Sequence, residues 1–249
     1  MEFVRRSLAR FAGPVGRFLY PPVCAGCGGA LAEAPAVCAG CWRSLRFIER
    51  PYCEVLGLPF SYDLGRGFLS AEAIADPPVF KRLRAALVYE ALAARMVASL
   101  KYADRADLVP LMAGWMRRAG REVIEECDVV VPVPLHSRRL LARKFNQSAE
   151  LARALARAER IAYAPLCLRR LRATRSQVGL GPDERLRNVR GAFAVAAGRE
   201  GEVVGRHVLL VDDVFTTGAT VSAATRALKR AGAAEVSVLV FARVAAGAG

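Results

Sequence analysis

The stretch Val208-Leu-Leu-Val-Asp-Asp-Val-Phe-Thr-Thr-Gly-Ala-Thr220 decides the fold of this 249-residue chain. Its apolar run predicts a buried parallel strand, with Asp212 and Asp213 at the carboxyl end of that strand. A short loop of small hydroxyl residues follows and opens a helix. Because ligands of open α/β sheets bind at the carboxyl ends of the strands, the segment predicts a binding site as well as a fold.

The loop after this strand has the composition of a phosphate site. Backbone amides of residues 216–220, at the amino-terminus of a helix, form an anion-binding nest, and the threonine hydroxyls add donors. Gly218 lets the backbone approach a phosphate closely. Asp212 and Asp213 can accept hydrogen bonds from two vicinal hydroxyls. The residues therefore predict a sugar phosphate, with the phosphate on the loop and a ribose diol on the acids.

Two other kinds of protein place acids or small residues after a strand. The acid pair of a response regulator normally lies near the start of its chain, whereas Asp212 lies near the end of this one. A Rossmann variant needs more glycines than this loop contains. Both alternatives fit less well than a sugar-phosphate loop.

Strands and helices alternate along the chain before and after this segment. Residues 81–102 are expected to form a strand and then a helix that ends at 102. Further strands are expected over 128–134, 191–196, 207–211 and 236–241, and further helices over 107–126, 147–160 and 219–231. A further apolar stretch covers 161–168. This alternation predicts a parallel sheet covered by helices, which is the α/β class.

Basic charge is concentrated in one part of the chain. The net charge is +14, and residues 137–190 hold 14 Lys and Arg against four Asp and Glu. Such an excess indicates an anionic partner, which can be a phosphate, a nucleic acid or an acidic protein. A solvated basic face is the alternative that charge alone leaves open.

Composition excludes two broad classes. With 54% hydrophobic residues the chain is not wholly disordered. The opening residues lack the apolar core of a secretory signal, and the longest uncharged run, 18–32, is too short and too broken by proline and glycine to span a bilayer. We therefore expect a cytoplasmic protein without a membrane span.

Four of the seven cysteines have the spacing of metal ligands. Cys24 and Cys27 form one C-x-x-C pair, and Cys38 and Cys41 form a second. Two such pairs complete a tetrahedral site, and closed four-cysteine sites hold structural Zn²⁺. A disulfide framework is the alternative, and an odd cysteine count in a cytoplasmic protein disfavours it. Cys53 has no second cysteine at the C-x-x-C position.

The segment from Val208 to Thr220 resembles the loop with which type I phosphoribosyltransferases bind phosphoribosyl pyrophosphate (PRPP). Further blocks, V-P-V-P-L at 131–135, F-N-Q at 145–147, R-L-R-N-V-R-G-A-F at 185–193 and L-K-Y at 100–102, together with the C-x-x-C pairs, resemble the ComF family of competence proteins. The resemblance implies an amino-terminal zinc finger, assigned to residues 1–60, on a phosphoribosyltransferase domain over 61–249.

The resemblance also implies roles for individual residues. Asp212 and Asp213 are the expected catalytic acids. The residues expected to bind PRPP are Thr216, Thr217, Gly218, Ala219, Thr220, Arg138, Arg139, Arg143, Arg175 and Lys101, the last from a hood-like region. Family members often carry a further cysteine cluster where this chain has Cys53 and Leu56 and no cysteine from 61 to 69, so a second metal site is not expected.

Two functions are compatible with these patterns. In the first, the chain takes part in natural transformation and transfers a ribosyl group from PRPP, which it holds with Mg²⁺. No residue identifies the acceptor of this group. In the second, it is a non-catalytic adaptor that binds single-stranded DNA or a ComFA-like helicase and uses PRPP as a regulatory signal. Single-strand binders add aromatic stacking platforms, and the basic segment offers few aromatic residues.

Overall fold

The computed structural model describes residues 22–32, 36–63, 65–103, 105–135, 145–172 and 191–245. The chain forms two compact units, residues 1–45 and residues 46–249. Residues 46–60, which the sequence analysis assigned to the zinc finger, thus lie in the second unit. There the amide of Ile48 donates to the carbonyl of Ala86, and the amide of Val88 donates to the carbonyl of Arg46. The functional boundary between the two modules stays a prediction.

The described residues of the first unit, 22–32 and 36–45, form one tight turn and one short helix. An isolated antiparallel bridge joins Val23 to Ala30, and the chain between them turns through Gly28, whose φ of +75° is the left-handed conformation that glycine adopts most easily. Helix α2 (Ala39–Arg43) then begins directly after Cys38. The turn and the helix each carry one C-x-x-C pair.

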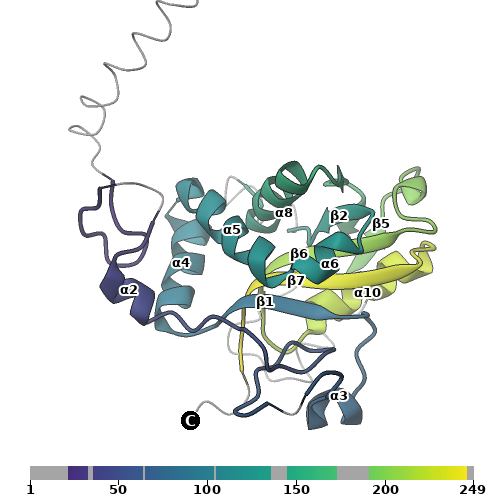
Figure 1. The fold of residues 1–249 in the computed structure, drawn as a ribbon. Helices are drawn as coiled ribbons and strands as arrows, with labels where there is room; N and C mark the ends of the chain where they lie inside the picture. The colour runs from purple at the N-terminus through teal and green to yellow at the C-terminus, as the bar shows by residue number, and fades with distance from the viewer. Residues whose placement is uncertain are drawn as a thin grey trace, which may run out of the picture. The chain divides into compact units, whose positions relative to one another are not determined.

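The second unit is organised around a five-stranded sheet (Figure 1). Its strands are β1 (Leu83–Val88), β2 (Val129–Pro132), β3 (Ala162–Tyr163), β6 (His207–Phe215) and β7 (Glu235–Arg243). They lie in the order β1-β7-β6-β2-β3, and every neighbouring pair is parallel. The predicted α/β class and parallel sheet are confirmed.

Helices cover both faces of this sheet, which explains why its central strands are almost continuous apolar runs. The helical elements that the structure describes in this unit are α3 (Ala71–Ala75), α4 (Ala91–Tyr102), η1 (Ala106–Leu108), α5 (Val109–Ala119), α6 (Arg121–Glu125), α8 (Gln147–Glu159), η2 (Glu200–Glu202) and α10 (Ala219–Arg230). Along this strand order, the connection from β2 to β3, which contains α8, runs toward the β3 edge of the sheet. The connection from β6 to β7, which contains α10, runs toward the β1 edge. Right-handed crossovers therefore place α8 and α10 on opposite faces (Figure 1).

Two elements differ from the sequence-based expectation. The helix expected over 107–126 is divided at Gly120, which ends α5 and lies so close to β7 that a Cβ there would be 2.6 Å from Leu239 Cδ1. The strand expected over 191–196 is β5 (Phe193–Val195), which pairs antiparallel with β4 (Leu168–Arg170) in a separate two-stranded sheet. The sequence indicated the strand but not its partner. Among the helices that the structure describes, none is long and apolar enough to cross a membrane.

Candidate functional site

Asp212 and Asp213 lie inside β6, three and two residues before its end, rather than at its carboxyl end as the sequence analysis expected. The cause is β7, which continues beside β6 as far as the pairing of Phe215 with Arg243. On the other side the ladder stops earlier, because β2 pairs only as far as Pro132 opposite Val211. The acid pair therefore begins where β6 loses one of its two neighbouring strands.

The carboxyl group of Asp212 is held by two donors. Ser148 Oγ donates to Asp212 Oδ1 at 2.8 Å, and the backbone amide of Asp213 donates to the same oxygen at 2.9 Å. Burial and the neighbouring charge of Asp213 raise the pKa of Asp212 to about 7, although the hydrogen bond from Ser148 acts in the opposite direction. The proton on this carboxyl group therefore comes off near neutral pH.

Ser148 was not among the residues that the sequence analysis singled out, although it follows the F-N-Q block directly. Asn146 caps helix α8 by accepting from the amide of Ser148 at 3.1 Å, and its side-chain amide donates to the carbonyl of Val133 at 3.0 Å. The cap thus ties the start of α8 to the end of β2 and aims Ser148 at the acid pair. An asparagine before a helical pattern signals such a cap, but the contact with Asp212 spans 64 residues and has no local signal.

Lys101 forms an ion pair with the second acid. Its Nζ lies 2.7 Å from Asp213 Oδ2, and both side chains are largely buried, with 20% and 11% of their surfaces exposed. Lys101 is the next-to-last residue of α4, a helix that follows β1 in the second unit, so it reaches the acid pair from the end of this helix. The structure brings Lys101 and the acid pair together as the sequence analysis expected.

The loop from Thr216 to Thr220 leads from β6 into α10. Thr216 and Thr217 are exposed, and α10 begins at Ala219 with Gly218 as its cap. Gly218 has a φ of +74°, and a Cβ there would lie 2.8 Å from the ring of Phe215. Glycine is needed on both counts. Amides in the first turn of a helix have no intrahelical partner, so this end of α10 can bind an anion.

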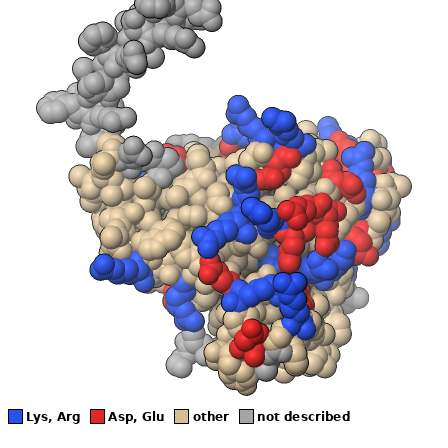
Figure 2. All heavy atoms as spheres, in the orientation of Figure 1, with Lys and Arg blue, Asp and Glu red and all other residues tan. Residues whose placement is uncertain are grey.

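Four predicted site residues, Arg138, Arg139, Arg143 and Arg175, lie outside the described residues, in 136–144 and 173–190. The same two segments hold eight of the 14 Lys and Arg of the basic stretch 137–190. Of the others, Arg153 pairs with Glu150. On the face drawn in Figure 2, Lys and Arg side chains lie beside Asp and Glu side chains and do not form a patch of one sign.

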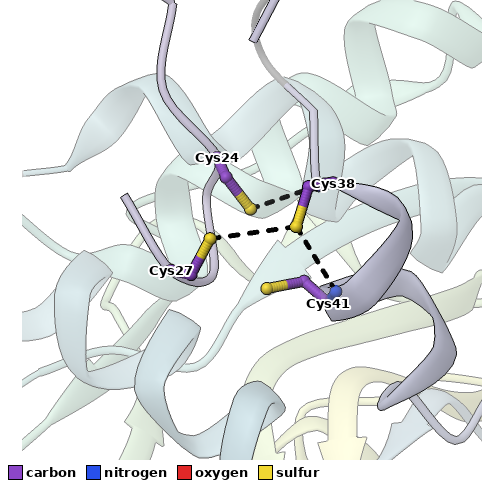
Figure 3. A group of neighbouring side chains, drawn as sticks. All are labelled: Cys24, Cys27, Cys38 and Cys41. Carbon is purple, nitrogen blue, oxygen red and sulfur yellow. Dashed lines mark hydrogen bonds between the residues drawn. The ribbon is translucent and has the colours of Figure 1, made fainter. Parts of the chain in front are cut away.

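The four predicted metal ligands of the first unit converge on one point (Figure 3). The Sγ atoms of Cys24, Cys27, Cys38 and Cys41 lie within 4.8 Å of one another. Burial opposes ionisation of Cys24, but backbone amides, including those of Cys27 and Cys38, donate toward its sulfur and lower its pKa to about 6. Four convergent thiol groups with amide donors on sulfur fit a tetrahedral zinc ion. With all four ligands from cysteine, such a site has no open coordination position for catalysis.

The parallel sheet, the acid pair on β6 and the loop that opens α10 define a phosphoribosyltransferase domain, and the cysteine cluster defines a zinc ribbon. Comparison with known families agrees: the double zinc ribbon domain matches residues 15–73, and the phosphoribosyl transferase domain matches residues 148–249.

Curated relatives named YhgH match most of the chain, and a competence protein matches about half of it. DNA utilization protein YhgH of Salmonella typhimurium is 33% identical over 196 residues, which are 77% of this chain and 83% of the relative. YhgH of Escherichia coli K12 is 31% identical, over 78% of this chain and 85% of the relative. Competence protein F of Haemophilus influenzae is 34% identical over 47% of this chain and 50% of the relative. The chain belongs to the ComF family, which these relatives represent.

Proposed function

We propose that the second unit binds PRPP or a related ribose 5-phosphate at the loop between β6 and α10. The observation that carries this proposal is the arrangement of Asp212 and Asp213 in the last four residues of β6, which leads into a loop whose glycine has a φ of +74° and caps a twelve-residue helix. An anion fits the helix amino-terminus, and hydroxyl groups fit the carboxylates. One ligand with both groups at the right separation is a ribose phosphate.

In this proposal each part of the site has one role. The amides and hydroxyls of Thr216 to Thr220 hold the 5-phosphate, while Asp212 and Asp213 accept hydrogen bonds from the ribose diol. Lys101 moves away from Asp213, which weakens their ion pair, and contacts the pyrophosphate. The arginines that lie outside the described residues contact the pyrophosphate as well: Arg138, Arg139, Arg143 and Arg175. Ser148 is a positioning residue, because it acts only through Asp212.

Mg²⁺ would be the metal of this site, since the carboxylate oxygens of Asp212 and Asp213 are hard ligands that suit it, and it would neutralise the charge of the pyrophosphate. The chain itself orients the ribose through the acid pair and fixes the phosphate on the loop. If a ribosyl group is transferred, positive charge develops at the ribose C1, and the nearby carboxylates stabilise that charge. The acceptor of such a transfer stays open.

We further propose that the protein acts in the use of incoming DNA in the cytoplasm, where its cysteines stay reduced. The proposal rests on the names of its relatives, a DNA utilization protein and a competence protein. Single-stranded DNA and a ComFA-like helicase are its expected partners. The alternative, an adaptor in which PRPP only regulates partner binding, uses the same site and differs in whether pyrophosphate is released.

Calorimetric titration of the full chain with PRPP and Mg²⁺ tests the ligand. The wild type should bind, and the double variant Asp212→Asn, Asp213→Asn should bind much more weakly, while its thermal unfolding stays cooperative. Ribose 5-phosphate serves as the matched ligand, because it reaches the loop and the acids but not the pyrophosphate contacts. Absence of binding by the wild type would refute the proposal.

A separate titration with a fluorescent single-stranded oligonucleotide at several salt concentrations tests the DNA partner. Binding through phosphates predicts a steep loss of affinity as salt rises. A signal that is absent, or that does not depend on salt, contradicts direct DNA binding and leaves PRPP binding untouched.

A further inference from the structure

The chain contains a second copy of the zinc-ribbon backbone in residues 51–75. In the first ribbon Cys24 donates its amide to Gly29 and accepts from Gly28, and a bridge joins Val23 to Ala30. Each of these residues has a counterpart 29 positions later with the same backbone interaction: Cys53 donates to Leu58 at 2.8 Å and accepts from Gly57 at 2.8 Å, and a bridge joins Tyr52 to Pro59. Gly57 also repeats the positive φ of Gly28, at +57°.

The helical half of the ribbon is repeated as well. In the first copy the amide of Cys38 donates to Cys24 Sγ at 3.2 Å, and Cys38 caps α2 by accepting from the amide of Cys41. In the second copy the amide of Ser70 donates to Cys53 Sγ, also at 3.2 Å, and Ser70 caps α3 by accepting from the amide of Ala73. One further backbone hydrogen bond is shared: the amide of Ala25 donates to the carbonyl of Ala36, and in the second copy the amide of Glu54 donates to the carbonyl of Phe68.

This correspondence identifies the four positions at which a second metal would be bound. Cys24, Cys27, Cys38 and Cys41 correspond in order to Cys53, Leu56, Ser70 and Ala73. A leucine and an alanine offer no ligand atom, and a serine hydroxyl is a poor ligand for zinc, so one thiol is left where a closed site needs four ligands. We propose that residues 51–75 are a zinc ribbon that keeps its backbone without a metal, and that the protein binds one zinc ion where the double-ribbon architecture provides for two.

Apolar packing replaces the ion in the second copy. Cys53, Leu56, Ser70 and Ala73 are all buried, with between 0% and 5% of their surfaces exposed, and Cys53, Leu56 and Ala73 belong to one apolar cluster with Phe80 and Leu83. In the first copy, by contrast, Cys27 is exposed, so burial contributes less there. Buried apolar area stabilises the second copy as the metal stabilises the first.

The second copy is also bonded to the sheet of its own unit. The amide of Leu83 donates to the carbonyl of Val55 at 2.7 Å, and the buried Arg84 donates to the carbonyl of Glu54 at 3.0 Å. Arg243, at the end of β7, donates to the carbonyl of Leu56. Gly57 lies so close to β1 that a Cβ would be 2.7 Å from the carbonyl oxygen of Leu83. The second ribbon is thus a fixed part of the phosphoribosyltransferase unit.

Zinc content of the purified full-length chain tests this inference. We expect one zinc per wild-type chain, the same value for Cys53→Ala, and close to none for Cys24→Ser. The variant Leu56→Cys, Ser70→Cys, Ala73→Cys restores four cysteines and should bind a second metal, so that Co²⁺ titration doubles the absorption of the thiolate–cobalt bands. The double variant Leu56→Ser, Ala73→Ser is the matched control, with polar groups at two of the same positions but no new thiols, and should bind one metal.

Two zinc ions per wild-type chain, or a loss of zinc in Cys53→Ala, would overturn the inference. So would a restored variant that keeps cooperative thermal unfolding but binds only one Co²⁺. If that variant does not fold, the wild-type and Cys53→Ala zinc contents still decide the question. None of these results depends on whether PRPP binds.

Discussion

Replacement of Gly218 by alanine tests how the loop before α10 is built. An alanine there keeps a φ of +74°, which costs about 1–2 kcal/mol for a residue with a side chain. Its Cβ would also lie 2.8 Å from the ring of Phe215, and such overpacking costs about 1–3 kcal/mol. The backbone cost and the overpacking cost together predict that the free energy of unfolding falls by about 2–5 kcal/mol. Such a change lowers the melting temperature by roughly 4–20 °C for a domain of this size.

Alanine substitutions at two other glycines separate the cost of the positive φ from the cost of overpacking. Gly198 has a φ of +78° with nothing near its Cβ position, so Gly198→Ala should lose only about 1–2 kcal/mol. Gly114 lies in helix α5 with open space around it and an ordinary φ, so Gly114→Ala should leave stability unchanged or raise it by about 0.4–1 kcal/mol.

Thermal unfolding and PRPP titration of the three variants measure these effects. Gly218→Ala should weaken PRPP binding at least tenfold, because the ring of Phe215 and the loop backbone must move apart, whereas the other two variants should bind as the wild type does. The reasoning is refuted if Gly218→Ala melts at the same temperature as Gly198→Ala and binds PRPP with unchanged affinity.

Four further results are expected. Ser148→Ala removes the hydrogen bond that lowers the pKa of Asp212, so the pH at which PRPP affinity rises should move upward, and a calorimetric pH series would show no shift if Ser148 were only structural. Because the pKa of Asp212 is raised from 3.8 to about 7 in the folded protein, the stability that its neutral form contributes is present below pH 3.8 and is lost as pH rises through about 7. Urea denaturation at pH 5 and pH 8 should therefore show a smaller pH dependence in Asp212→Asn, and an identical dependence would contradict the assignment. Lys101→Met should weaken PRPP binding about tenfold, by analogy with other hydrogen bonds to charged groups, and ribose 5-phosphate binding much less; equal losses for both ligands would place Lys101 away from the pyrophosphate. A strong chelator should remove zinc and abolish amide protection within residues 22–45 while the second unit keeps its melting temperature, and loss of both units together would argue against a metal-free second ribbon.

Local patterns predicted most of the elements. The apolar run from Val208 to Val211 is long and unbroken, and both C-x-x-C pairs have a spacing that few other sites share, so strand and metal ligands follow from the sequence. The parallel order of the sheet follows from the alternation of strands and helices. The antiparallel pairing of β4 with β5 does not, because residues 168–170 and 193–195 are separated by a long segment and no short-range signal joins them.

The candidate site was predicted where chemistry is local and missed where it is not. Asp212, Asp213 and Gly218 lie in one motif, so their proximity is given by the chain itself. The contact of Ser148 with Asp212 depends on how α8 packs against β6. Of the second ribbon, the sequence offered only the resemblance at Cys53 and Leu56, because three of its four ligand positions hold no cysteine. The backbone hydrogen bonds and bridge of residues 51–75 show that this region repeats the first ribbon.

A crystal structure of the full chain with PRPP and Mg²⁺ tests the central claim most directly. The account predicts the 5-phosphate on the backbone amides from Thr216 to Thr220, the ribose hydroxyls on Asp212 and Asp213, and a longer distance between Lys101 Nζ and Asp213 Oδ2 than the present 2.7 Å. PRPP bound elsewhere on the chain, or a loop without ligand at saturating concentration, would contradict it.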